Sequence, residues 1–189
     1  MDYQFEPTRV ETKAGHMYII PAGTVVANGG TPITVSKNVW PDAVPTDNYA
    51  DYELKEINSI KPNFEKDSEQ REYASSTDGY TKSKDEWITE RSWTVETDMT
   101  NALIIMLEEG LTALPVVGTA ATPGARKESY VEAVVLMEIG TRGIGITKRR
   151  WIWARVYLES PGDSTSKISK ISLRVAMQEA DNNSFEQVA

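Results

Sequence analysis

Residue types that commonly carry out catalysis or bind metals are sparse in this sequence. The 189 residues include no cysteine and a single histidine, His16. A catalytic histidine needs a nucleophile and an orienting partner, and a zinc site needs several His or Cys ligands. His16 is therefore interpreted as structural, and no metal or other cofactor is expected. The glycines of GTRGIG (140–145) fit neither a P-loop nor a dinucleotide-binding fingerprint, so they predict a turn between strands.

Charged residues form one basic cluster and one acidic pair. KRRW (148–151) could stack on nucleic-acid bases, or its long basic side chains could cover tryptophan faces at a strand end. The second interpretation is favoured, because a net charge of −8 suits a general nucleic-acid binder poorly. Glu108 and Glu109 lie at the C-terminal end of a predicted helix, where the helix dipole disfavours anions. The energetic cost is small if the two side chains are exposed or pair with a basic residue. A carboxylate pair of the glycosidase kind has no sequence support, and no enzyme is expected.

Between residues 86 and 97 the sequence alternates with a period of two, which predicts a strand. One face carries Trp87, Thr89, Arg91, Trp93 and Val95, and the other carries Ile88, Glu90, Ser92, Thr94 and Glu96. Because buried aromatic side chains contribute large apolar areas, Trp87, Trp93 and Val95 are predicted to lie in the core. The opposite face, small and acidic after Ile88, is expected to meet water.

A helix is predicted to follow this strand directly. Asp98 or Thr100 can cap its first turn by accepting a backbone N–H bond. Leu103, Ile104 and Leu107 then recur at helical spacing and are predicted core residues. Gly110 suits a left-handed stop, which gives a helix of about three turns.

A long polar segment, residues 61–84, precedes the strand. Phe64, Tyr73 and Tyr80 are its only large apolar side chains. Structureless stretches of this length are uncommon inside compact domains. The segment is therefore predicted to be either a disordered surface loop or a projecting loop that orders on a partner.

The remaining segments predict a mainly β protein of α+β type. Residues 16–26 and 31–36 form short strands around the NGG turn, residues 130–140 a buried strand, and residues 146–179 a β-hairpin. The expected architecture is a β-sandwich or half-open barrel with one short flanking helix. Residues 1–16 are assigned to an N-terminal arm, 17–180 to the β domain, and 181–189 to a polar C-terminal tail. No apolar run approaches the roughly 20 residues of a membrane span, so a soluble protein made in the cytoplasm is expected.

The order of these features resembles the major tail proteins, or tail tube proteins, of tailed bacteriophages. The resemblance covers residues 60–180 and rests on TERSWTVETD running into the helix NALIIMLEEG, and on the late strand pair within 146–179. It implies a structural virion protein that forms stacked, hexameric rings around a hollow conduit for DNA. It also implies assembly in the host cytoplasm and contacts with other tail proteins: the tape measure protein, the terminator and, where the tail has one, the sheath. A virion or cell-surface β-sandwich binding module is the alternative.

The resemblance assigns roles to two sets of residues. Glu90, Ser92, Thr94 and Glu96 are expected to line the lumen, where a negative wall would repel phosphate and let DNA slide without specific binding. Within the segment 61–84, Phe64, Arg71, Tyr73 and Tyr80 are expected to contact the neighbouring ring, with the two termini as supporting arms.

Overall fold

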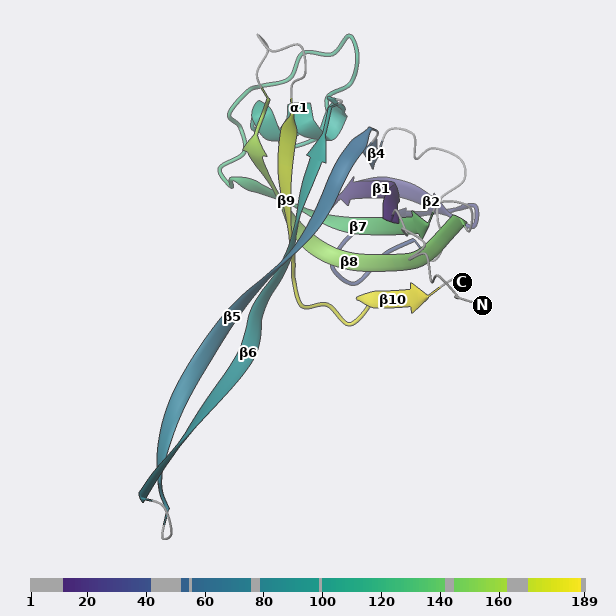
Figure 1. Cartoon of the computed structure of the whole chain (residues 1–189). Coiled ribbons are helices and arrows are strands. Elements are labelled where there is room, and N and C mark those ends of the chain that lie inside the picture. The colour runs from purple at the N-terminus through teal and green to yellow at the C-terminus, as the bar shows by residue number, and fades with distance from the viewer. Residues whose placement is uncertain are drawn as a thin grey trace, which may run out of the picture.

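The computed structural model describes residues 12–41, 52–54, 56–75, 79–98, 100–141, 145–162 and 170–187, which form a mainly β protein with one short helix (Figure 1). The predicted fold class is therefore confirmed. The elements are β1 (Thr12–Pro21), β2 (Val25–Asn28), β3 (Thr31–Thr34), β4 (Glu53–Leu54), β5 (Ile57–Ser75), β6 (Gly79–Thr97), α1 (Ala102–Glu108), β7 (Tyr130–Thr141), β8 (Gly145–Ser160), β9 (Ile171–Met177) and β10 (Ser184–Gln187).

One antiparallel sheet of eight strands dominates the protein. Seven strands follow the order β4-β1-β7-β8-β9-β6-β5. The eighth, β10, pairs with the same edge of β8 as β9 does, but with a different part of that strand. This order is a linear path and does not close into a barrel. The predicted strand at 130–140 and the predicted β8–β9 hairpin are confirmed. Strands β2 and β3 form a separate hairpin around Gly29 and Gly30, whose φ values of 56° and 87° confirm the predicted turn.

Parts of both predicted terminal arms take part in the sheet, while residues 181–183 form a turn before β10. Residues 12–16 belong to β1, and residues 184–187 form β10. Residues 1–11 and 188–189 lie outside the described part of the chain, as do residues 142–144 of the predicted GTRGIG turn. The strands on either side of that turn, β7 and β8, are antiparallel neighbours.

The core occupies both faces of the sheet, at different places. On one face, a single cluster contains Trp93 and Val95 of β6 together with Leu103, Ile104 and Leu107 of α1, and these five predicted core residues are all buried. The alternation of β1 then places Ile19 in this cluster and Ile20 on the opposite face. There a smaller cluster lies under the β2–β3 hairpin: Ile20, Val26, Val35, Trp40, Val134 and Trp153.

The prediction that Trp87 belongs to the core is wrong, because β6 pairs with the body of the sheet only from Ser92 onward and no core cluster of the described residues lies against it at Trp87. A β-bulge also interrupts the alternation of β6. Glu65 of β5 lies opposite Glu90, and the next residue, Lys66, lies opposite Ile88, so Thr89 has no partner. The extra residue moves Trp87 to the face of Glu90 and brings Ile88 to the face of Trp93. Trp87 is 44% exposed and Ile88 is 43% exposed, so neither face of β6 is buried at this point.

The N-cap of the helix lies one residue after Thr100 and three residues after Asp98, the two predicted caps. Asn101, not Asp98 or Thr100, is the N-cap, and its Oδ1 accepts a 3.0 Å hydrogen bond from the Ile104 backbone N–H. The helix has seven residues, or about two turns. Gly110 ends it with a φ of 61°, as predicted. Because so short a helix is unstable alone, packing of its buried side chains must hold it.

Replacing Asn101 by Ala should remove the cap and lower the free energy of unfolding by about 1 kcal/mol. The matched control, Asp98→Ala, should change it by no more than about 0.5 kcal/mol, because the Asp98 side chain is exposed. Urea denaturation followed by circular dichroism measures both. A larger loss for Asp98→Ala would contradict the assigned cap.

Candidate functional site

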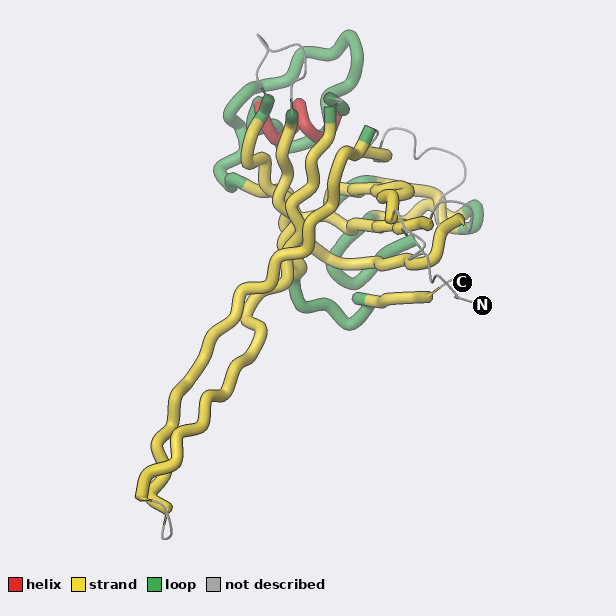
Figure 2. The backbone as a smooth tube through the Cα atoms, in the orientation of Figure 1, coloured by secondary structure: helices red, strands yellow, loops and turns green. Residues whose placement is uncertain are grey.

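Strands β5 and β6 extend far beyond the rest of the sheet as a two-stranded ribbon. β6 pairs with β9 only from Ser92 to Thr97, whereas its pairing with β5 continues outward to Ser75 and Gly79. Figure 2 shows the two strands leaving the body together. We call residues 64–75 and 79–91 the projecting hairpin.

The predicted loop at 61–84 is thus β-structure in all its described residues, and residues 76–78 lie outside them. The segment projects from the body, which agrees with one of the two predicted alternatives. It does so as two paired strands and not as a loop. Its sequence lacks alternation because a ribbon with no core against it can be wet on both faces, so neither face requires apolar residues.

The four residues predicted to contact a neighbouring ring all belong to the projecting hairpin. Phe64 lies at its root, opposite Arg91, and is 51% exposed. Arg71, Tyr73 and Tyr80 lie toward the far end by backbone register, and their side chains lie outside the described part of the structure. An isolated two-stranded hairpin is marginally stable in water. The unpaired edges of the projecting hairpin and its exposed aromatic side chains, such as Phe64, are therefore suited to binding a partner.

The sheet surface opposite the helix-covered core carries a continuous group of polar side chains, which we call the polar sheet face. Strand register places its members on one side of the sheet, running across four strands and onto β5. They are Lys61, Glu90, Thr94, Glu96, Tyr130, Glu132, Arg155, Tyr157 and Arg174.

Each carboxylate of the polar sheet face lies beside a cation. Glu90 pairs with Arg174 at 3.5 Å, Glu96 with Lys61 at 3.4 Å, and Glu132 with Arg155 at 3.7 Å. The Ser59 hydroxyl and the Lys61 ammonium lower the pKa of Glu96, so its carboxylate stays ionised near neutral pH. The face therefore combines three acids with three bases, and is not the uniformly acidic wall that the sequence predicts.

Aromatic rings support two of these cations. The Arg155 guanidinium lies 4.6 Å from the Tyr130 ring centroid, and the Arg174 guanidinium lies 4.7 Å from that of Tyr157. The two tyrosine rings are themselves 5.5 Å apart. Both arginines are thus engaged by a ring and a carboxylate within the protein, which leaves them less available to an outside anion, although the buried Arg155 Nε has no hydrogen-bond partner among the described residues.

Of the predicted lumen residues, the polar sheet face contains Glu90, Thr94 and Glu96. Ser92 points to the same side but is 4% exposed, so the expectation that it meets water is wrong. It lies between Asn63 and Ala176, where neighbouring strands on both sides cover its small side chain. The aromatic and arginine members from β7, β8 and β9 were missed, because only strand order reveals that they share this face.

The chemistry-bearing residues of the sequence have structural partners. His16 Nδ1 lies 2.8 Å from Glu53 Oε1, across the β1–β4 pairing. In KRRW, Arg149 bonds the buried Glu138 at 2.9 Å, and Arg150 covers the Trp93 ring at 4.9 Å. This agrees with the interpretation favoured from the sequence, in which basic side chains cover tryptophan rings. The covered ring, Trp93, belongs to another strand. Among the described residues, no group of three or more His, Cys, Asp or Glu side chains could hold a metal ion.

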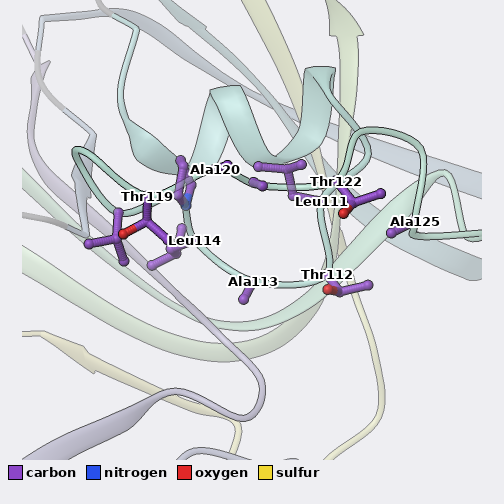
Figure 3. A pocket seen from close by; sticks show the side chains of 11 residues that line it. Leu111, Thr112, Ala113, Leu114, Thr119, Ala120, Thr122 and Ala125 are labelled. Carbon is purple, nitrogen blue, oxygen red and sulfur yellow. The ribbon is translucent and has the colours of Figure 1, made fainter.

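A hollow of about 300 Å³ lies beside α1, within the loop that follows it (Figure 3). Its lining, from Leu111 to Ala125, carries hydroxyl and apolar side chains and includes no acid, base or histidine. It therefore offers no group for general acid–base chemistry.

Replacing Glu90, Glu96 and Glu132 together by Gln should leave Lys61, Arg155 and Arg174 without their carboxylates. The resulting basic face should bind duplex DNA roughly tenfold more tightly than the unaltered protein at low salt, because each freed cation can neutralise a phosphate. Fluorescence anisotropy with a short labelled duplex measures this affinity.

The matched control is Asp98→Asn, Glu159→Gln and Glu179→Gln, which changes the net charge equally at three exposed positions. DNA affinity should rise much less in this control. Equal affinities for the two triple variants would show that the pairing on the polar sheet face has no special effect.

No helix in the described part of the chain is long and apolar enough to cross a membrane. No family model, curated protein or solved structure matches this sequence.

Proposed function

We propose that this protein is a tail tube subunit of a tailed bacteriophage, a structural protein whose copies assemble into stacked rings around a conduit for DNA. The observation that carries the proposal is the projecting hairpin, because its outer part pairs with nothing else in the described chain. A ribbon of this kind is best explained by a contact with a second copy.

The length of the projecting hairpin suits a contact with a copy stacked along an axis. From Arg91 to Gly79 the strand β6 extends by about 40 Å, at roughly 3.3 Å per residue. A body of about 150 residues has a diameter of the same order. The hairpin of one subunit is therefore long enough to reach across a neighbouring ring. This would explain why its outer part does not pair with the rest of its own chain.

The unpaired sheet edge suits contacts within a ring. In the described chain, β5 pairs with β6 alone, so its outer edge is open from the body to the tip of the ribbon. Exposed edges invite strand addition, and soluble proteins usually block or cover them. A head-to-tail contact that uses this edge closes into a ring when the rotation between copies permits it.

The polar sheet face suits the wall of the conduit. Its ion pairs cancel three acids against three bases, and the chain as a whole has a net charge of −8. A wall of this kind is hydrated but has no free cationic site for phosphate, so DNA can pass along it without adhering. Other tail components, such as the tape measure protein and the terminator, would contact the ends of the assembled tube.

Replacing residues 68–86 by Asn-Gly should leave a folded monomer that no longer polymerises. Asp67 and Trp87 face each other across the two strands, so a two-residue type I′ turn can connect them. No residue of the removed part whose side chain the structure describes belongs to either core cluster, and thermal unfolding should therefore stay within a few degrees of that of the full chain. Negative-stain microscopy and analytical ultracentrifugation report the assembly state.

The full chain and Val117→Ser, which alters a fully exposed loop residue, serve as assembling controls. Normal tubes from the shortened variant would contradict the role of the hairpin. A full chain that forms only monomers or closed trimers would instead favour a surface binding module.

A further inference from the structure

A basic and aromatic groove lies where the projecting hairpin meets the body. Two adjoining hollows, of about 240 and 290 Å³, share Phe64, Trp93, Arg150 and Phe185 in their linings, and Arg91 borders one of them. Phe64 and Phe185 are each about half exposed. We call this feature the root groove. It is open to solvent and large enough for a few side chains of a partner.

The root groove holds cations without matching anions. The Arg150 guanidinium lies 4.9 Å from the Trp93 ring centroid and 5.4 Å from that of Phe185. Burial, and secondly the nearby charge of Arg91, lower the pKa of Arg150. In the described part of the chain neither arginine forms an ion pair with a carboxylate, whereas Arg149 beside them bonds both Glu138 and Glu186. The arrangement favours an anion flanked by apolar groups.

The surface with the complementary chemistry is one face of α1. Ile105, Glu108 and Glu109 lie at positions i, i+3 and i+4, and therefore share a face of the helix. Ile105 is 38% exposed, and both glutamates are exposed with no ion pair among the described residues. Two carboxylates at a helix C-terminus also face an unfavourable dipole, which a partner cation would relieve.

The two surfaces lie at opposite ends of the body. Figure 1 shows α1 at one end, while the hairpin leaves and β10 lies toward the other. One chain cannot bring them together, but two stacked copies can. Such a contact joins different surfaces, so it repeats from copy to copy without closing on itself.

We propose that the root groove of one copy binds the Ile105–Glu108–Glu109 face of α1 from the next copy along the stack. The carboxylates pair with Arg91 and Arg150, and Ile105 packs against the aromatic rings. This inference rests on the proposed function, since it names the surfaces through which successive rings meet.

Charge reversal tests the pairing. One variant carries Arg91→Glu and Arg150→Glu, and the other carries Glu108→Lys and Glu109→Lys. Either variant alone presents like charges at this contact, so each should remain unassembled under conditions in which the unaltered protein forms tubes. Mixed in equal amounts they should assemble, because every groove then meets a helix of opposite charge. Sedimentation and negative-stain microscopy measure the result.

A second experiment tests the same contact without the charge-reversed variants, which could fail to assemble because they fail to fold. The chain has no cysteine, so Arg91→Cys in one copy and Glu109→Cys in another create a single reporter pair. Mixing the two under oxidising conditions should yield a disulfide-linked dimer, while the control mixture of Arg91→Cys with Glu159→Cys should not. Circular dichroism confirms that each variant is folded.

The inference is overturned if folded charge-reversed variants assemble alone, if their mixture fails to assemble, or if the cysteine pair does not cross-link in assembled tubes. In these cases the proposed function stands whenever the unaltered chain still forms tubes that depend on the hairpin. An unaltered chain that never assembles overturns both.

Discussion

The architecture depends on the division of strand β6 between two environments. From Ser92 to Thr97 it is an interior strand, hydrogen-bonded to β5 on one side and to β9 on the other. Before Ser92 it has β5 alone. Its inner half anchors Trp93 and Val95 in the core beneath α1, and this anchoring holds the outer half in a fixed direction. The bulge at Thr89 lies where the strand leaves the sheet, and such bulges increase local twist and bend the strand that carries them.

Charges in the described part of the chain are paired on one surface and unpaired on two others. On the polar sheet face, acids and bases are paired with one another, and tyrosine rings support the arginines. At the two ends of the body, charges are left without partners, cations in the root groove and carboxylates on α1. A paired surface gains little by binding an ion, whereas unpaired groups gain a charge-assisted hydrogen bond. Under the proposed function, the paired surface would be the wall past which DNA moves, and the unpaired groups would form the contacts between copies.

Local sequence patterns predicted the elements that bury one clear face. The helix around Leu103 and Ile104, the strand at 130–140 and the β8–β9 hairpin all follow from their periodicity. Periodicity does not reveal that Trp87 lies outside the core, because nothing local marks where β6 leaves the sheet or where its bulge adds a residue. It does not predict the hairpin as strands either, because backbone pairing, not apolar alternation, holds the hairpin together. The polar sheet face needed strand order, since Tyr130, Arg155 and Arg174 come from separate strands and only the fold makes them neighbours.

Cryo-electron microscopy of the assembled, unaltered protein tests the central claim most directly. A tail tube subunit should give a hollow tube of stacked rings in which Glu90, Arg174 and Tyr157 face the bore and the projecting hairpin contacts the adjacent ring. A closed assembly with the hairpin free in solvent, or a tube with the polar sheet face on its outer surface, would contradict it.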